Sequence, residues 1–152
     1  GSKPQLQSLN IYELSCEVIA YIANRLPKQS GITLTCSGEK NARIPGDWVL
    51  LRWAMENIMK NAVDAIGLVN GKIEVFISIN ENGILLDIRD TGKGINRADW
   101  KNIFRPGYSS KRRGWGLGLS LTQRIIEEIH RGGIRVLRSK QGETVFRLNF
   151  LK

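Results

Sequence analysis

Two glycine-rich segments of the chain have the residue types that bind phosphate groups. The first is Asp90-Thr-Gly92-Lys-Gly94, and the second is Gly114-Trp-Gly116-Leu117-Gly118. Glycine reaches positive φ angles and lets phosphate oxygens approach backbone amides closely. The second segment leads into apolar residues at helical spacing, so it is predicted to open a helix, whose N-terminal amides attract anions. Together the segments indicate a nucleotide pocket, whereas either one alone could be no more than a tight loop.

Three polar residues on a predicted long helix could hold the metal ion of such a nucleotide. Asn57, Asn61 and Asp64 are spaced i, i+4 and i+7, at the border of a broad apolar face. Carboxamides and carboxylates that are shielded from water need polar partners. Magnesium bound to phosphate oxygens would supply one, because this ion takes few ligands from protein. Interhelical or loop hydrogen bonds are the alternative.

Asp90 is predicted to point into the protein. It continues the row of Ile84, Leu86 and Ile88 on one side of a predicted strand. An inward carboxylate needs strong hydrogen-bond donors. The exocyclic amino group of a purine is one such donor. The alternative is a structural role, in which Asp90 caps the turn at Thr91-Gly92.

The elements that must position these residues follow from apolar periodicity and capping signals. Helices are predicted from the Asn10 cap to Pro27, from the Asp47 cap through Trp48 to Val69, over 96–103 and over about 117–130. Strands are predicted at 32–36 and 43–44, and in two hairpins that join 72–79 to 84–89 and 134–137 to 144–150. This series is typical of one α/β domain.

Length and composition limit the class of protein. With 152 residues and 41% hydrophobic content, the chain is long enough to bury a core without disulfides. Cys16 and Cys36 occur singly and are interpreted as buried thiols of a reducing compartment, so the cytoplasm is the expected location. No apolar run is long enough to cross a membrane, and any anchor of a parent protein is expected outside this piece. Gly1-Ser2 is interpreted as a cleavage scar from expression.

The positive charge does not by itself identify a partner. A net charge of +9 suits nucleic acid, anionic lipid, an acidic protein or a polyanionic ligand. The basic groups at 111–113 and 131–140 lack the interleaved aromatic residues of a single-strand binder, so a solvated surface is favoured for them. His130, the only histidine, is predicted to be a helix-end cation or a surface residue rather than a catalyst.

In their order along the chain, the motifs resemble the ATP-binding catalytic domain of sensor histidine kinases, within the superfamily of gyrase, Hsp90 and MutL. Residues 56–65 resemble the N box, 90–95 the G1 box, 103–111 the F box and 114–119 the G2 box. The resemblance implies the Bergerat fold, a two-layer α/β sandwich with a mixed sheet of about five strands packed on three helices. Residues 1–9 are expected to be the scar and a linker, and 10–152 the catalytic ATP-binding domain.

The resemblance also assigns roles to individual residues. Asn61 would bind Mg²⁺ with Asn57 beside it, and Asp90 would receive the adenine amino group. Lys111 and Arg113 would reach the terminal phosphates, where cations offset the charge of a transferring phosphoryl group. Asn57, Lys111 and Arg113 are the residues expected to act in catalysis. The full set expected to contact the nucleotide is Asn57, Asn61, Asp64, Asp90, Gly92, Gly94, Phe104 as the anchor of the lid, Lys111, Gly114, Gly116, Leu117 and Gly118.

The implied activity is transfer of the γ-phosphoryl group of Mg·ATP to a histidine in two-component signalling. In this family the acceptor histidine lies on a separate dimerisation hairpin, which the sequence does not contain, so the domain is expected to be inactive toward protein by itself. The implied partners are that hairpin and, indirectly, a response regulator receiver domain; no nucleic acid and no direct membrane contact are expected.

One feature favours phosphoryl transfer over ATP hydrolysis as the expected activity. Superfamily members that hydrolyse ATP generally have a glutamate one turn before the magnesium asparagine. Here that position is Asn57, and Glu56 is rotated away by about 100°, which favours phosphoryl transfer over hydrolysis. The alternatives are a stand-alone serine kinase of the anti-sigma type and an ATP-gated clamp or ATPase module without phosphotransfer.

Overall fold

A five-stranded mixed sheet forms one layer of the protein. The computed structural model describes residues 5–108 and 116–151. The strands are β2 (Ile32–Gly38), β4 (Gly71–Asn80), β5 (Gly83–Asp90), β6 (Gly133–Lys140) and β7 (Glu143–Leu151), in the spatial order β2-β4-β5-β7-β6. The first pair is parallel and the other three pairs are antiparallel. Both predicted hairpins and the mixed sheet are confirmed.

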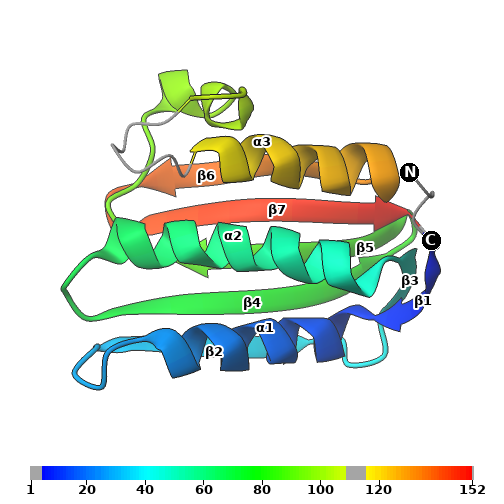
Figure 1. The fold of residues 1–152 in the computed structure, drawn as a ribbon, viewed down its shortest axis with the longest axis horizontal. Coiled ribbons are helices and arrows are strands. Elements are labelled where there is room, and N and C mark those ends of the chain that lie inside the picture. The colour runs from blue at the N-terminus through cyan, green and yellow to red at the C-terminus, as the bar shows by residue number, and fades with distance from the viewer. Residues whose placement is uncertain (1–4, 109–115, 152) are drawn as a thin grey trace.

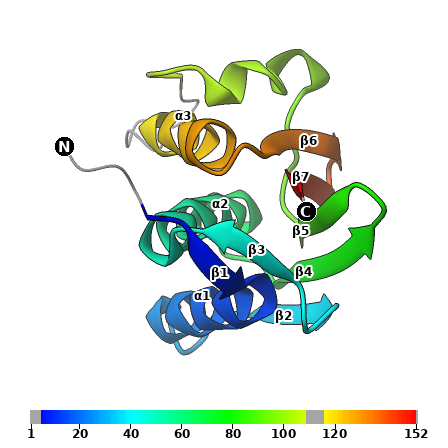
Figure 2. The same cartoon turned by 90° about the vertical axis from the view of Figure 1, so that its right-hand side faces the viewer.

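Three helices form the second layer and cover one face of the sheet (Figures 1 and 2). They are α1 (Ile11–Arg25), α2 (Trp48–Ile66) and α3 (Gly116–Arg124). Both predicted N-caps are confirmed, because Asn10 accepts from the Glu13 backbone N–H at 3.0 Å and Asp47 accepts from that of Leu50 at 3.0 Å. The two-layer α/β sandwich predicted from the sequence is therefore the observed fold.

Helix α2 ends about one turn earlier than predicted. Its last residue is Ile66 rather than Val69, and Gly67 follows with a φ of 74°. Side chains disfavour this left-handed backbone, whereas glycine adopts it readily and commonly ends helices. The Gly67 backbone N–H still donates to the Val63 carbonyl at 3.0 Å. The isolated glycine thus stops the helix before the Asn70-Gly71 turn.

The segments on either side of the predicted lid differ from regular α-helix. In place of the single short helix predicted over 96–103, the segment has two 3₁₀ turns, Arg97–Asp99 and Asn102–Phe104, and the second ends one residue beyond the predicted helix. Helix α3 continues as a π-helix over Ile125–Ile129. In that turn the His130 backbone N–H donates to the carbonyl five residues earlier, at Ile125. The predicted helix over about 117–130 therefore exists, with a widened last turn.

A strand that the sequence analysis missed precedes α1. Strand β1 (Gln7–Asn10) pairs antiparallel with β3 (Arg43–Gly46) to form a separate two-stranded sheet. Leu9 is 6% exposed and joins the core. Residues 7–9, expected to belong to a linker, are thus part of the fold. Four residues are too few to display the alternation that marks a strand.

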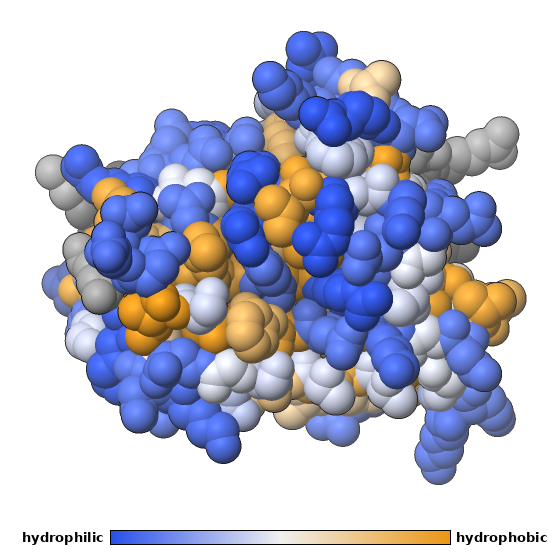
Figure 3. Space-filling model, turned by 180° about the vertical axis from the view of Figure 1, so that it is seen from behind, coloured by the Kyte–Doolittle hydropathy of each residue, from blue (hydrophilic) through white to orange (hydrophobic). Residues whose placement is uncertain are grey.

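The two faces of the large sheet have different chemistry. The inner face packs against the helices through apolar side chains of β4, β5 and β7, among them Ile77, Ile88 and Leu148. On the outer face, Figure 3 shows hydrophilic and hydrophobic side chains interleaved. Arg147 there contacts Asp87 at 2.8 Å, and Arg89 contacts Glu143 at 2.7 Å. Within the described residues, no helix is long and apolar enough to cross a membrane.

The interpretation of both cysteines as buried thiols is wrong for Cys16. Cys16 is exposed, and Cys36 is half-buried. Cys16 follows the fully buried Ser15, and one residue along a helix turns the side chain by about 100°. Its position on the flank of α1 thus leaves the thiol accessible. Neither cysteine forms a disulfide in this structure.

Candidate nucleotide site

Helix α3 begins against Asn57 of α2. A β-carbon added at Gly118 would lie 3.3 Å from both Cγ and Oδ1 of Asn57. Asn57 is 8% exposed, and its amide donates to the Trp53 carbonyl at 3.2 Å. The missing side chain at Gly118 is what lets the two helices approach here. The structure therefore brings a predicted N-box residue to the glycine-rich helix start.

Asn61, one turn further along α2, has a buried donor without a partner. Its Nδ2 atom is buried, and no hydrogen-bond partner lies near it in the structure as described. Such a donor costs about 1–3 kcal/mol when it is left unsatisfied. A ligand that brings oxygen atoms to this point would remove that cost. A carboxamide also has an acceptor oxygen, the type of ligand that Mg²⁺ prefers.

The first glycine turn packs against the C-terminal end of α2. A β-carbon at Gly92 would lie 2.7 Å from both the carbonyl carbon and the β-carbon of Ala65. The Lys93 backbone N–H donates to the Ala65 carbonyl at 3.1 Å. Asn61 lies one helical turn from Ala65 on one side and from Asn57 on the other. The unsatisfied amide thus occurs on the stretch of α2 between the two glycine segments.

Asp90 ends strand β5 inside the protein, as predicted. It is 3% exposed, and its Oδ1 accepts a hydrogen bond from the Gly92 backbone N–H at 2.8 Å. This bond is the turn cap that the sequence analysis left as the alternative role. A carboxylate has two oxygens with about four acceptor sites. The cap is therefore compatible with a second hydrogen bond to a base.

Two hydroxyl residues next to this turn were missed by the sequence analysis. Thr144 on β7 is 2% exposed and is the register partner of Asp90. Its Oγ1 lies 2.6 Å from the Ser139 Oγ, which in turn accepts from the Ile95 backbone N–H at 2.7 Å. The signal was available for Thr144, because it shares the inward alternation of Phe146 and the later apolar residues of β7. Ser139 had no such signal.

Gly94 holds this loop against the β6–β7 turn. Its φ is 88°, and an added β-carbon would lie 2.6 Å from the Lys140 carbonyl oxygen. The Gly142 backbone N–H donates to the Gly92 carbonyl at 2.8 Å. Both glycines of the first segment are therefore required for close backbone contact, with Gly92 packed on α2 and Gly94 on the closing hairpin.

Phe104 anchors the segment that follows this loop to the core. It is 7% exposed, and its ring meets that of Phe146 edge to face, with 6.3 Å between centroids. Such pairs contribute about 0.5–1.5 kcal/mol beyond burial. Phe146 lies two residues after Thr144 on the same inward row of β7. The aromatic contact thus fixes the start of the predicted lid relative to the loop at 90–95.

The other described candidate residues lie on α2 and at the start of α3. Asp64 lies on an exposed part of α2, beyond Asn57 and Asn61. Gly116 and Leu117 form the first residues of α3. Lys111, Arg113 and Gly114 lie outside the described residues.

His130 is neither the cation nor the surface residue that was predicted. It is 8% exposed, its Nε2 accepts from the Asp47 backbone N–H at 2.9 Å, and its Nδ1 lies 2.8 Å from the Ile125 carbonyl oxygen. Burial lowers the pKa of His130, although the bond to Ile125 and the charge of Asp47 act in the opposite direction. The neutral ring therefore joins the end of the third helix to the start of α2.

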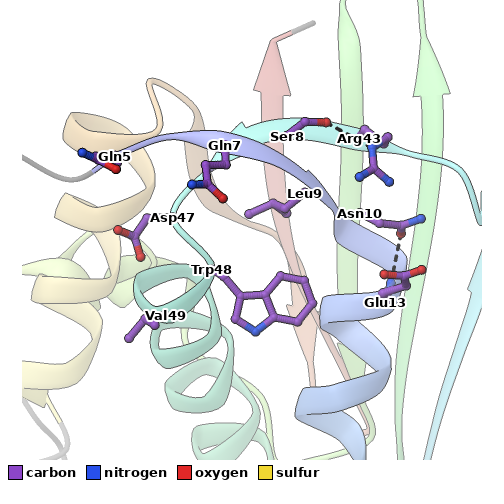
Figure 4. Close-up of a pocket in the computed structure, with 11 residues that line it drawn as sticks. Gln5, Gln7, Ser8, Leu9, Asn10, Glu13, Arg43, Asp47, Trp48 and Val49 are labelled. Atoms are coloured by element: carbon purple, nitrogen blue, oxygen red, sulfur yellow. Dashed lines mark hydrogen bonds between the residues drawn. The ribbon is translucent and has the colours of Figure 1, made fainter.

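A cavity of about 430 Å³ lies at the other end of α2 (Figure 4). It is lined by β1, Arg43 and the helix start, including Asp47 and Trp48. Asn57 is about 14 Å further along the helix axis from Trp48. None of the predicted nucleotide residues lines this cavity. It is therefore not the site to which the glycine segments belong.

Protein side chains alone do not form a metal centre in the described ranges 5–108 and 116–151. No group of three or more histidine, cysteine, aspartate or glutamate residues there could hold an ion. Asn61 does fit a magnesium ion that arrives with a nucleotide, because such an ion takes most of its oxygens from phosphates and water. The metal, if bound, would therefore depend on the nucleotide.

Comparison with known proteins identifies the same class of domain. The family described as "Histidine kinase-, DNA gyrase B-, and HSP90-like ATPase" matches residues 46–152. Sporulation kinase A of Bacillus subtilis (strain 168) is 32% identical over 156 residues, which cover 99% of this chain and 25% of that protein. The signal transduction histidine-protein kinase AtoS of Escherichia coli (strain K12) is 42% identical over 94 residues, 61% of this chain and 15% of that protein.

A solved structure agrees with this fold over nearly the whole chain. The nucleotide-free catalytic domain of the histidine kinase ThkA superposes with a TM-score of 0.87 at 26% identity, covering 97% of this chain and 96% of that one. The chain spans about a quarter of the length of Sporulation kinase A. The fold, the order of the four boxes and the family match agree, and the chain belongs to the family of histidine kinase-, DNA gyrase B- and HSP90-like ATPases.

Proposed function

We propose that this domain binds Mg·ATP and transfers its γ-phosphoryl group to a histidine carried by another segment of the parent protein. The observation that carries the proposal is the buried, unpartnered Nδ2 of Asn61, on the stretch of α2 between Gly118 and Gly92. A phosphate oxygen would accept from this amide, and Mg²⁺ would bind its Oδ1. The metal would supply charge stabilisation of the transferring group.

Most of the candidate residues have a defined task in this proposal. Asp90 accepts the adenine amino group, and Thr144 and Ser139 keep the loop in position. The amides at the start of α3, with Gly116, Leu117 and Gly118, face the phosphates. Lys111, Arg113 and Gly114 act on the terminal phosphates, a role that rests on the sequence motifs alone.

Positioning, rather than activation of water, is the chemistry that these residues support. Glu56, the carboxylate next to Asn57 in the sequence, forms an ion pair with Arg52 at 2.9 Å. Arg52 also contacts Glu17 of α1 at 2.9 Å. Glu56 is therefore engaged on the side of α2 that faces α1. Without a carboxylate at position 57, general-base activation of water is weak, and the acceptor's own base must come with the acceptor.

A phosphotransfer assay tests the function. The domain, radiolabelled ATP and Mg²⁺ are mixed with the histidine-bearing dimerisation hairpin of the parent protein. The expected product is a labelled hairpin whose phosphate is lost in acid and retained in alkali, as for phosphohistidine. Acid-stable label would instead indicate the serine kinase, and rapid phosphate release without the hairpin would indicate an ATPase. In the cell, the phosphorylated hairpin would then serve a response regulator, which we expect to lie in the cytoplasm with this domain.

A further inference from the structure

Strand β2 is an edge of the large sheet, and its outer side has no strand neighbour. It pairs only with β4, and the register runs without a shift from Ile32 to Gly38. Among the described segments, none lies on its far side (Figures 1 and 2). Proteins commonly protect such an edge with charges, prolines or bulges. Because β2 contains no charged residue and no proline, this edge is unprotected.

The pairing with β4 indicates which backbone groups of β2 are unpaired. Gly31 and Glu39, which flank the strand, both form backbone hydrogen bonds to β4, at 3.2 Å and 2.9 Å. Successive residues of a strand direct their backbone groups alternately to its two sides. The odd-numbered residues therefore bond to β4. Leu34 and Cys36 direct their N–H and C=O groups to the free side.

The opposite edge of the sheet, β6, is protected. Its basic side chains are all exposed, and they are Arg135, Arg138 and Lys140. Its pairing with β7 also has an irregularity between Val136 and Arg138. Charges and bulges of this kind discourage pairing with another chain. The same sheet thus has one edge that repels an additional strand and one edge that can accept it.

Helix α1 borders the free edge of β2 with uncharged side chains. One flank of the helix faces α2, where Glu17 forms an ion pair with Arg52 at 2.9 Å. The residues of the other flank recur at helical spacing, and they are Tyr12, Cys16, Ile19 and Ala23. The first and third of them are half-buried against the core, and the other two are exposed. A strand added to β2 would therefore meet no charge on this side.

The position of α1 limits the partners that can use this edge. Helix α1 lies over β2 (Figure 2), so a second copy that added its own β2 would bring its own α1 alongside. Neighbouring strands are about 4.8 Å apart, whereas the axes of packed helices need about 8–10 Å. Each copy also has a net charge of +9, which opposes self-association. A single extended segment has no helix to accommodate and avoids both problems.

We propose that β2 accepts an extended, uncharged segment of a partner protein as an additional strand. The backbone of that segment pairs with Leu34 and Cys36, a mode of recognition known as β-augmentation. Its side chains on one side are apolar and meet the uncharged flank of α1. Those on the other side are polar and lie beside the exposed Thr33 and Thr35. This inference is independent of the nucleotide site, and its failure would leave the proposed function intact.

Nuclear magnetic resonance tests the proposal with a synthetic probe. The peptide Asn-Val-Thr-Val-Thr-Val-Asn, acetylated and amidated, has the required alternation and no charge. On its titration into the isotope-labelled domain, we expect chemical-shift changes along β2. Amide exchange of Leu34 and Cys36 should slow by about tenfold at saturation. The same peptide N-methylated at every residue has no N–H donors and should leave these amides unchanged.

Two substitutions of Cys36 separate its N–H from its side chain. Cys36→Pro removes the outward N–H but no bond to β4, and proline is tolerated at such edge positions. Cys36→Ala removes only the thiol. Cys36→Pro should bind the peptide about tenfold more weakly, as expected for one lost hydrogen bond, and Cys36→Ala should bind as the parent does. Circular dichroism checks that both variants fold, and the N-methylated peptide gives the same contrast without any substitution in the domain.

Three results would overturn the proposal. The first is that the β2 amides do not respond to the unmodified peptide, or that the shift changes lie elsewhere. The second is that the N-methylated peptide binds as well as the unmodified one. The third is protection of Leu34 and Cys36 that rises with domain concentration in the absence of peptide, because a second copy would then occupy the edge.

Discussion

Gly118 and Asn57 form the contact by which α3 meets α2. The 3.3 Å that would separate a Gly118 β-carbon from the Asn57 amide is tighter than most such contacts, so the amide would have to move by a few tenths of an ångström. Asn57 is buried and is held by the Trp53 carbonyl. Adding a methyl group at position 118 therefore tests whether the position of the Asn57 amide affects nucleotide binding.

We expect Gly118→Ala to weaken Mg·ATP binding by about tenfold, the equivalent of one displaced hydrogen bond. Stability should fall little or even rise, because alanine favours helix over glycine by up to about 1 kcal/mol. Isothermal titration calorimetry and urea unfolding measure the two effects. Ser120→Ala, two residues along α3, is the matched control and should bind as the parent does. Equal affinity of Gly118→Ala and the parent would contradict a nucleotide at this contact.

Asp90→Asn should abolish the preference for adenine. The asparagine oxygen can still accept from Gly92, but an NH₂ group replaces the second acceptor, so about 1.5–3 kcal/mol of a charged hydrogen bond is lost. Titration with ATP and GTP measures the change. Asp87→Asn is the control, because Asp87 is on the other side of the same strand and contacts Arg147. An Asp90→Asn domain that prefers ATP as the parent does would leave Asp90 with the turn cap alone.

Asn61→Ala should weaken binding of the magnesium complex more than binding of metal-free ATP. The alanine removes the buried donor and the acceptor together, so stability should change little while the ligand loses a partner. Titrations in Mg²⁺ and in EDTA separate the two contributions. Glu56→Gln, whose side chain is engaged by Arg52, should match the parent in both conditions. An equal loss with and without metal would argue against a role of Asn61 toward Mg²⁺.

The stability of the domain should decrease as the pH falls through the ordinary pKa range of histidine. Burial lowers the pKa of His130 in the folded state, so the unfolded chain binds the proton more readily. Protonation of the unfolded chain therefore lowers the free energy of unfolding as the pH falls below about 6.5. Because His130 is the only histidine, urea unfolding between pH 5.5 and 7.5, about one unit on either side of that pKa, isolates its effect.

His130→Gln is the control for this dependence. Glutamine does not titrate, so its free energy of unfolding should vary less over the same pH range than that of the parent. Its stability at neutral pH should stay within about 1–3 kcal/mol of the parent value, the cost of one unsatisfied buried group, because the glutamine Oε1 can still accept from the Asp47 N–H. Parallel pH curves for the two proteins would show that other groups cause the slope.

Local patterns were sufficient to predict most of the architecture. The caps at Asn10 and Asp47, the period of α1 and α2, and the alternation in β4 and β5 are properties of neighbouring residues, and each was recognised. The inward position of Asp90 followed from the same alternation. The glycine segments indicated where backbone would approach closely, and Gly92 and Gly118 do lie against α2.

The features that could not be predicted depend on residues far apart in the chain. His130 is buried because the backbone N–H of Asp47, 83 positions away, needs an acceptor, and no local signal reveals that pairing. Ser139 on β6 likewise accepts from the backbone N–H of Ile95, in a loop 44 positions earlier, and no local signal reveals that pairing. Strand β1 is too short to display a period, and the exposure of Cys16 depends on which flank of α1 faces β2. In each case a contact with a residue far away in the chain, rather than the local sequence, determines the observed structure.

The position of β7 in the sheet governs when this domain can begin to work. Strand β7 follows all the other strands in the sequence, yet it lies between β5 and β6. While the polypeptide emerges from the ribosome, β5 has no neighbour on that side, and Asp90 lacks Thr144 until β7 is synthesised. In the proposed function, Asp90 would therefore be ready to receive a purine only after the β6–β7 hairpin has been synthesised.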